Sequence, residues 1–373
     1  MDFKNCTLGE IIQFKNGKKR PQEDGQYPVY GGNGILGYSK ETNYCNCIAI
    51  GRVGAYCGSV YYEPESCWIS DNAIVALPKE GVDIKYAYYL LKSSHLNRRH
   101  IGTGQPLLTQ DILNRIECIV PSFEEQKRIS SVLWLLDEKI AENQRINNNL
   151  EQQLRAIFVE RFTNNPALDS IQQVPLSELC SVVTKGTTPT TLGKPFVDRG
   201  INFLKAESIL DNHSLDKGKF AHIDEETHDM LKRSVIYAGD IVFTIAGTLG
   251  RFALMDNDIL PANTNQAVAI IRADKGKISP EYLYACFIGN WHNDYYSKRV
   301  QQAVQANLSL TTIKSLPIPV LTQDEMVSYM ALISPIVRML KQNEMENERL
   351  AILRDMLLPC LMNGEIDVSD IKI

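Results

Sequence analysis

A heptad pattern of apolar residues occurs twice in this chain, and the second copy follows the first at a constant distance of 200 residues. Both copies keep the apolar positions at alternating spacings of three and four, and both carry two asparagines in the middle. The matched positions are Leu133, Leu136, Ile140, Asn143, Asn147, Leu150, Leu154 and Ile157, then Ile333, Ile336, Leu340, Asn343, Asn347, Leu350, Arg354 and Leu357. This spacing predicts a left-handed coiled coil. A chain that repeats it predicts the order module, long helix, module, long helix.

The asparagine pair predicts how the two helices meet. Antiparallel pairing brings Asn143 and Asn147 against Asn343 and Asn347, and polar residues in an apolar seam fix the register at some cost in stability. Parallel pairing also matches these layers, but the second module would then have to return along the whole coil. We therefore predict antiparallel pairing within one chain. A generic dimerisation coil is the alternative, and the internal copy argues against it.

Each long helix has a recognisable start. Ser122 with Glu125, and Thr322 with Glu325, match the capping box, in which the hydroxyl and the carboxylate each bond a backbone N–H. Pro335 interrupts the second helix, because proline removes a helical hydrogen bond. The helix either kinks there or restarts, with Ser334 as N-cap and Pro335 at the first helical position.

The segments around the helices predict two similar mixed modules. Strand-like runs alternate with glycine, proline and asparagine, and CIAIGRVGAYCGSVYY (47–62) resembles DIVFTIAGTLGRFALM (240–255). Each run places a Gly-x-x-Gly turn after an apolar strand. We predict a mixed α/β (α+β) fold with an internal pseudo-two-fold repeat, in which two globular modules are separated by two long helices of an antiparallel coiled coil. The expected ranges are 1–123 and 164–321 for the modules, and 124–163 and 322–373 for the helices and the tail.

Composition excludes several classes of protein. A chain of 373 residues with 44% apolar and 22% charged residues has room for two or more ordinary globular domains. It shows no secretory signal and no apolar run of membrane-spanning length, so a cytoplasmic protein without membrane contact is expected. Cys45, Cys47, Cys57 and Cys67 could ligate zinc in principle, but they lack the paired spacing of zinc sites, and we expect reduced cysteines and no metal. The net charge of −5 does not by itself indicate a nucleic-acid binder.

Catalytic motifs are missing where an enzyme would need them. An adenine methyltransferase needs a glycine-rich cofactor loop and an Asn/Asp-Pro-Pro-aromatic motif, whereas Asn165-Pro166-Ala167 stops short of it. The segment from Gly186 to Lys194 has the wrong spacing for a phosphate-binding P-loop. The histidines form no metal-ligand pattern. The sequence therefore predicts a protein without an active site of its own.

Four segments combine glycine with basic, amide or hydroxyl residues, at 15–38, 98–105, 185–191 and 298–307. Lysine and arginine suit phosphates, and arginine, glutamine and asparagine suit base edges. A polar surface loop is the simpler interpretation of any one segment, but recurrence in both modules favours DNA binding. With two arginines of the Gly-x-x-Gly segments, the candidates are Lys15, Lys18, Lys19, Arg20, Asn33, Arg52, Arg98, Arg99, Gln105, Lys185, Thr187, Thr188, Thr190, Arg251, Lys298, Arg299 and Gln302.

Motifs spread over nearly the whole chain resemble those of the specificity subunits of type I restriction-modification enzymes. They are YPVYGGNGILGYS (27–39), the Pro-x-x-Glu-Glu-Gln helix start (121–126), LDEKI (136–140), TKGTTPT (184–190), FTIAGTLGR (243–251) and LMNGEI (361–366). The second helix start, from Thr322 to Met326, lacks the Glu-Gln pair. For that reason the resemblance supports less strongly that the two helices are equivalent as surfaces on which partner subunits would dock.

The resemblance implies a non-catalytic subunit with two target recognition domains, each reading one half of a split sequence in double-stranded DNA. Two methyltransferase subunits would dock on the helices, and restriction subunits would join them. S-adenosylmethionine, ATP and Mg²⁺ would act on those partners. The coil would serve as a ruler that holds the two modules about one DNA turn apart, roughly 34 to 36 Å.

Three other functions compete with this interpretation. One is a specificity subunit of a type II-like restriction-modification enzyme. Another is a coiled-coil adaptor without a DNA role. The third, a fused methyltransferase or nuclease, is disfavoured by the missing motifs.

Overall fold

The computed structural model describes residues 3–102, 104, 106–163, 171–300 and 307–371. The chain divides into two compact units: unit 1 holds residues 1–142 and 346–373, and unit 2 holds residues 143–345. Two long helices, α4 (Phe123–Phe162) and α10 (Gln323–Met362), contribute to both units.

Unit 1 is built on a sheet of six described strands. Its order is β2 (Ile12–Asn16), β7 (Ala73–Pro78), β5 (Tyr44–Gly51), β6 (Val60–Ile69), β3 (Tyr27–Gly31) and β4 (Gly34–Ser39). All neighbours are antiparallel except β3 and β6. A separate ladder pairs β1 (Lys4–Thr7) with β8 (Glu117–Val120). The helical elements of this module are α1 (Leu8–Ile11), η1 (Gly54–Tyr56), α2 (Ile84–Ser93), η2 (Leu96–Arg98) and α3 (Gln110–Asn114).

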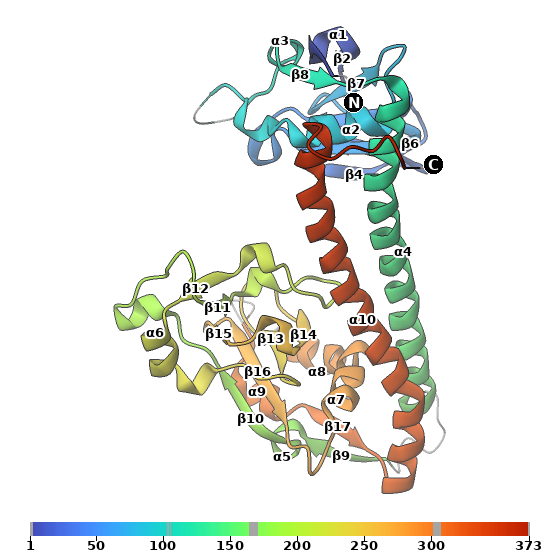
Figure 1. Cartoon of the computed structure of the whole chain (residues 1–373). Coiled ribbons are helices and arrows are strands. Elements are labelled where there is room, and N and C mark those ends of the chain that lie inside the picture. Colours follow the sequence, from blue (N-terminus) through green and yellow to red (C-terminus); the bar gives the residue numbers. More distant parts are fainter. Residues whose placement is uncertain (1–2, 103, 105, 164–170, 301–306, 372–373) are drawn as a thin grey trace. The chain divides into compact units, whose positions relative to one another are not determined.

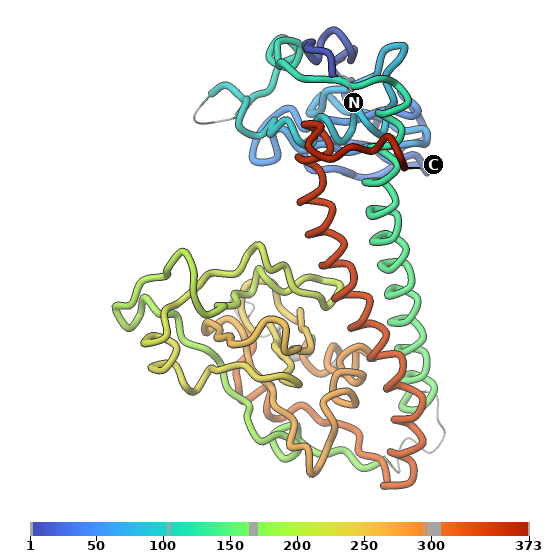
Figure 2. Tube along the Cα trace, viewed as in Figure 1, coloured from blue at the N-terminus to red at the C-terminus, as the bar shows by residue number. Residues whose placement is uncertain are grey.

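The core of unit 1 is completed by the end of the chain. Tyr86 and Tyr89 of α2 are fully buried, and Leu133 of α4 packs in the same cluster. Met362 at the end of α10 and Val368 in the tail belong to it as well. Both chain ends lie in unit 1, as the trace in Figure 2 shows. The second helix therefore returns to finish the core that the first module began.

Unit 2 holds two sheets among the described residues. The larger has the order β10 (Cys180–Lys185), β16 (Val268–Ala273), β13 (Ile241–Thr244) and β14 (Phe252–Leu254), all antiparallel. The smaller places β11 (Ile201–Leu204) between antiparallel β12 (Ala221–Ile223) and parallel β15 (Ala262–Thr264). A ladder pairs β9 (Gln172–Pro175) with β17 (Pro317–Val320). The helical elements are α5 (Leu176–Leu179), η4 (Pro189–Leu192), η5 (Ala206–Ser208), η6 (Lys217–Lys219), α6 (Glu225–Met230), η7 (Lys232–Ser234), η8 (Asn257–Ile259), α7 (Pro280–Ile288), α8 (Trp291–Val300) and α9 (Leu310–Lys314).

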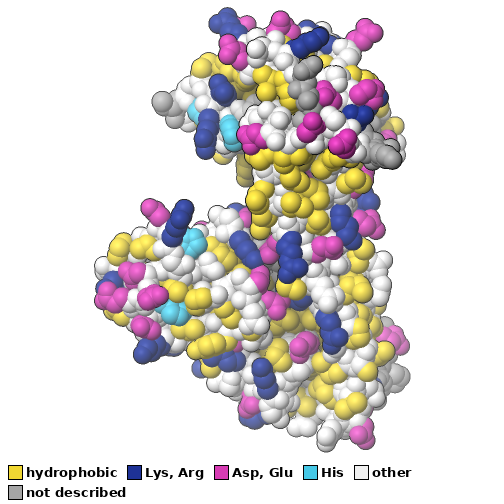
Figure 3. Space-filling view, in the orientation of Figure 1, with side chains coloured by type: hydrophobic (Ala, Val, Ile, Leu, Met, Phe, Trp, Pro, Cys, Tyr) yellow, Lys and Arg dark blue, Asp and Glu magenta, His cyan; other side chains and the backbone are white. Residues whose placement is uncertain are grey.

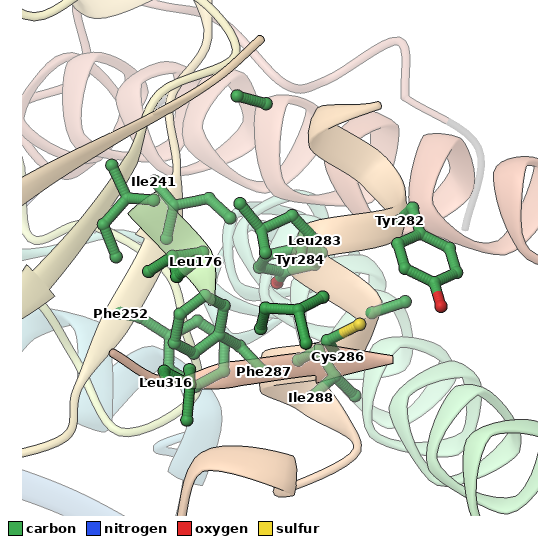
Figure 4. Packing of buried hydrophobic residues seen from close by; sticks show 14 of the residues in the cluster. Leu176, Ile241, Phe252, Tyr282, Leu283, Tyr284, Cys286, Phe287, Ile288 and Leu316 are labelled. Atoms are coloured by element: carbon green, nitrogen blue, oxygen red, sulfur yellow. The ribbon is translucent and has the colours of Figure 1, made fainter. Parts of the chain in front are cut away.

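The core of unit 2 forms around α7, whose residues Tyr282 to Ile288 are all buried. They share a cluster with Leu176 of α5, Ile241 and Phe252 of the sheet, and Leu316 just before β17 (Figure 4). α4 adds aromatic residues to the same cluster, which gives both long helices an apolar face against this module. Burial of such side chains stabilises by roughly 1.5 to 3 kcal/mol each.

The long helices pair antiparallel within each unit. In unit 2, Asn343 Nδ2 donates to Asn147 Oδ1 at 2.8 Å, and Asn147 Nδ2 donates to the Leu340 carbonyl at 3.2 Å. Further along, Arg161 forms an ion pair with Glu325 at 2.5 Å. Contacts therefore move towards the start of α10 as they move towards the end of α4, which is antiparallel pairing. Asn143 is buried in unit 2, while Asn347 belongs to unit 1.

In unit 1 the same helices are tied by ion pairs, Arg354 with Asp137 at 2.7 Å and Lys139 with Glu346 at 3.7 Å. α10 continues through Pro335 as one helix, which excludes one of the two alternatives given for this proline, the restart at Ser334. The predicted fold class, two similar mixed α/β modules with an antiparallel coil and an internal repeat, is confirmed. The module boundaries stay predictions.

Candidate DNA-recognition loops

Both modules contain the same backbone crossing at the end of an edge strand. Gly17 follows β2, and a Cβ added to it would lie 1.9 Å from the Ser70 carbonyl oxygen. Gly186 follows β10, and a Cβ there would lie 1.9 Å from the Thr264 carbonyl oxygen. Because only glycine fits such an approach, both positions fix the loop that follows against a neighbouring turn. The predicted basic loop at 18–20 and the TKGTTPT loop therefore occupy corresponding places.

In unit 1 the loop at 18–20 lies beside β4 and the end of β6. Trp68 Nε1 donates to the Lys18 carbonyl at 3.2 Å, and Arg20 Nη1 donates to the Leu36 carbonyl at 3.3 Å. Ser70 N donates to the Tyr30 carbonyl at 2.8 Å, which joins the turn after β6 to β3. The predicted residues Lys18, Lys19, Arg20 and Asn33 are all exposed here, and Lys15 is exposed on β2 itself.

The segment that carries Arg98 and Arg99 packs on the loop at 51–58. Leu108 N donates to the Arg52 carbonyl at 2.9 Å, and Gly54 N donates to the Pro106 carbonyl at 3.0 Å. Gly58 allows η2 to approach, since a Cβ there would lie 2.4 Å from the Asn97 nitrogen. Both arginines are exposed and Arg52 is half-buried. Gln105 lies outside the described residues.

These segments form one connected set of loops in unit 1, which we name the first loop cluster: residues 17–20, 31–34, 51–58, 70–72, 96–102 and 106–108. Gly51 links two of its parts, because a Cβ there would lie 2.7 Å from the Gly32 carbonyl oxygen. Its exposed cations suit phosphates, and its amide and guanidinium groups suit base edges. The sequence predicted most members of this cluster but not their contacts.

The second loop cluster, in unit 2, consists of residues 185–192, 232–234 and 264–267. Thr187 N donates to the Thr264 carbonyl at 3.2 Å, and Thr188 Oγ1 donates to Gln266 Oε1. Lys185 and Thr190 are exposed, while Thr187 and Thr188 are half-buried.

Arg233 of η7 also belongs to the second loop cluster, because its Nη2 donates to Thr187 Oγ1 at 3.1 Å. Neither Arg233 nor Gln266 is among the candidate residues predicted from the sequence. The signal for Arg233 is only a Lys-Arg pair after a short helix, which a surface turn explains equally well.

Arg251 is held inside unit 2 by a carboxylate. Its Nε and Nη2 bond the two oxygens of Asp211 at 2.6 and 2.7 Å, and Nη1 donates to the Ile209 carbonyl at 3.2 Å. This arginine is not a free cation at the loop surface. The side chains of Lys298 and Arg299, and all of Gln302, lie outside what the structure describes.

The hydrogen bonds also correct the register of the internal repeat. Arg52 N donates to the Asn72 carbonyl at 3.0 Å, and Ile245 N makes the corresponding bond to Ala267 at 2.8 Å. Leu108 and Leu308 then bond the carbonyls of Arg52 and Ile245, both at 2.9 Å. Arg52 therefore corresponds to Ile245, and the two Gly-x-x-Gly turns are offset by three residues. They look alike in sequence but do not occupy the same place.

The ionisable groups of the described residues form no metal centre. No cluster of histidine, cysteine and carboxylate side chains among them could hold a metal ion. Cys6 and Cys118 lie with their sulfurs 3.5 Å apart across β1 and β8, and burial raises the pKa of Cys118 to about 12. No helix within the described ranges is long and apolar enough to cross a membrane.

Comparison with known proteins agrees with this architecture. A family model described as type I restriction modification DNA specificity domain matches residues 1–152 and 169–343. The specificity subunit of the type I restriction enzyme EcoprrI from Escherichia coli is 33% identical over 146 residues, which span 37% of this chain and only 36% of that relative. The specificity subunit of type I restriction enzyme MjaVIII from Methanocaldococcus jannaschii is 22% identical over 100% of this chain and 94% of its own length.

A solved structure shares the fold. The type I restriction-modification system S subunit from M. genitalium is 18% identical, with a TM-score of 0.59, over 97% of this chain and 96% of the other. The family match covers both modules, most of α4 and about half of α10. The chain therefore belongs to the family of type I restriction-modification DNA specificity proteins.

Proposed function

We propose that this protein is the DNA-recognition subunit of a type I restriction-modification enzyme and has no catalytic site of its own. Each loop cluster would read one half of a bipartite sequence in double-stranded DNA. The single observation that carries this proposal is the repeated backbone crossing at Gly17 and Gly186, which fixes a polar loop at the same place in both modules. The cytoplasm, where such an enzyme meets DNA, is the compartment we propose.

The chemistry of modification and cleavage would be supplied by partner subunits. Two methyltransferase subunits would bring S-adenosylmethionine, and restriction subunits would bring ATP and Mg²⁺. The paired helices would carry these partners and set the spacing of the two half-sites.

The test of DNA recognition uses the complex of this chain with its methyltransferase subunits. Methylome sequencing of cells that express the complex should reveal one split recognition sequence. Replacing Arg98 and Arg99 with alanine should weaken DNA binding and lower the salt dependence by about one unit of slope per lost phosphate contact. A double variant of Lys4 and Arg115, exposed cations of the same module outside the loop cluster, is the matched control. Full affinity with an unchanged slope would remove the two arginines from the interface.

An exposed apolar surface on the helices favours a docked partner. In unit 1, Ile352, Leu353 and Met356 of α10 are 61, 44 and 66% exposed, and Leu135 of α4 is 64% exposed. Figure 3 shows hydrophobic side chains gathered over this part of α10. Apolar side chains that gather on a surface mark interaction sites more often than single ones do. We assign this face to a methyltransferase subunit.

Replacing both Ile352 and Met356 with serine should weaken assembly with the methyltransferase while leaving the fold of unit 1 intact. Native mass spectrometry of the co-expressed subunits measures the ratio of methyltransferase to this chain. Met230→Ser, which replaces another exposed methionine, on α6, is the control. An unchanged ratio in the double variant would exclude this face as the docking site.

A further inference from the structure

The second loop cluster obtains its positive charge differently from the first. The crossings at Gly17 and Gly186 align Lys18 with Thr187 and Lys19 with Thr188. The hydroxyls of the second module thus stand where the first module has cations. A cation is nevertheless present at this position, because Arg233 reaches Thr187 Oγ1 from the segment between β12 and β13.

Gln266 stands on the other side of the same threonine pair. Its Oε1 accepts a hydrogen bond from Thr188 Oγ1. This bond does not use the other polar group of the side chain, the Nε2 amide, which is a donor. Its backbone neighbour Asn265 accepts a turn hydrogen bond from Val268 N, as Ser70 does from Ala73 N in unit 1. Both Gln266 and Arg233 are exposed. The loop therefore presents a guanidinium and an amide N–H group, each held by a threonine.

We propose that Arg233 and Gln266 read a guanine in the half-site of the second module, an inference that rests on the proposed DNA-recognition function. Guanine presents two acceptors in the major groove, N7 and O6, so a base contact there needs two donors. The Arg233 guanidinium, oriented by Thr187, supplies one N–H, and Nε2 of Gln266, oriented by Thr188, supplies the other. Thr187 and Thr188 hold the two side chains in place, which a base contact needs more than a phosphate contact does, because it depends on direction as well as charge.

The experiment uses the full complex with methyltransferase subunits, after the bipartite sequence of the wild type has been established. Arg233→Ala and Gln266→Ala are each assayed for methylation of duplexes in which every base of the sequence is varied in turn. The expected result is a loss of about 5- to 100-fold in discrimination at one guanine of one half-site. Preference at the other half-site, which unit 1 reads, should stay unchanged. Arg233→Lys keeps the charge but loses the planar guanidinium that Thr187 orients, and should relax the same position.

The matched control is Lys275→Ala, which removes one exposed cation beyond the opposite end of β16 and should leave base preference unchanged. Retained discrimination in both the Arg233 and the Gln266 variants would overturn the inference. So would an equal loss of affinity for every sequence with a smaller salt slope, because that is the behaviour of a phosphate contact. A wild-type complex that methylates no split sequence would instead refute the proposed function.

Discussion

At equivalent positions of the helical repeat, unit 1 has a polar cluster and unit 2 has apolar residues. In unit 1, Asp137 accepts hydrogen bonds from Tyr89 Oη at 2.6 Å and from Arg354 at 2.7 Å. The positions 200 residues away are Val337 and Leu154, which are 2 and 0% exposed in the core of unit 2. One copy of the seam thus contains a polar cluster where the other is apolar. The ion pair is not required by the helix pairing itself.

Arg354→Leu alone should destabilise unit 1 by about 2 kcal/mol, because it leaves the half-buried Asp137 carboxylate without a charged partner. Adding Asp137→Val and Tyr89→Phe should restore or exceed the wild-type stability, since replacing all members of a buried polar cluster by apolar groups is often neutral or favourable. Chemical denaturation of the three-residue variant and of Arg354→Leu measures both effects. A triple variant less stable than the single one would contradict the argument.

The pH dependence of unit 2 should report on Glu151. Burial, and then the nearby Glu344 carboxylate, raise the pKa of Glu151 from 4.5 to about 7. The folded state therefore keeps a proton that the unfolded chain has lost, and this carboxyl group favours folding less and less as the pH rises from about 4.5 through 7. The melting temperature of Glu151→Gln, measured relative to that of the wild type, should be higher at pH 8 than at pH 5. If the difference in melting temperature between the variant and the wild type is the same at pH 5 and pH 8, the role given to Glu151 is refuted.

His292 changes stability with pH in the opposite direction in the same unit. It is packed among Phe243, Phe252 and Phe287, and burial lowers its pKa from 6.5 to about 3. Stability from the neutral imidazole is lost as the pH falls from about 6.5 towards 3. Since this contribution is common to the wild type and Glu151→Gln, the comparison between them cancels it.

At the scale of elements, the molecule depends on a few close approaches that local sequence pattern does not reveal. β2 and β10 end in the same backbone crossing. The only local sequence signal for it is a lysine shortly before a glycine, Lys15-Asn16-Gly17 in one module and Lys185-Gly186 in the other. α10 keeps its helical course through Pro335 because its apolar face is buried on both sides of that residue, with Ile333 and Val337 in the core of unit 2. Packing overrides the local cost of a missing hydrogen bond.

Gly186→Ala should destabilise unit 2 by about 1 to 3 kcal/mol or more, because the added methyl group would collide with the Thr264 backbone. Gly17→Ala should do the same in unit 1. Gly104→Ala is the control, since a Cβ there meets nothing within 4 Å. Thermal unfolding of the three variants distinguishes them, and a Gly186 variant as stable as the Gly104 variant would show that the crossing relaxes without cost.

At the scale of the whole molecule, each unit is completed by chain from distant parts of the sequence. Unit 1 needs residues 346–373 for its core, and unit 2 takes in the end of α4 as well as the start of α10. Each module therefore depends on both helices. A break in either helix is expected to affect both modules.

If the two continuous helices act as a ruler, the enzyme should not accept a changed distance between half-sites. Moving one half-site by two base pairs displaces it by about 7 Å and rotates it by about 70° around the DNA axis. Methylation of such a duplex by the assembled enzyme should fall to the level of an unrelated sequence. Methylation at the wild-type rate would refute the ruler.

Much of this architecture was determined by sequence alone. The heptads, the copied asparagines and the capping boxes are local and periodic, so they predict two long helices, their antiparallel register and the duplicated plan before any contact is known. The family motifs share this property, because each is a contiguous run of residues. Glycine-rich basic segments likewise identified most members of the first loop cluster.

Only the tertiary structure decided which polar side chains act together. Arg233 lies 46 residues from Thr187, Gln266 lies 78 residues from Thr188, and Arg251 is bound by Asp211 from 40 residues away. The true alignment of the Gly-x-x-Gly turns was likewise visible only from backbone hydrogen bonds. Loops are positioned by the strands and crossings that anchor them, and those long-range contacts leave no period in the sequence. The sequence therefore identifies the family of the protein, while the fold determines which of its loop residues lie together.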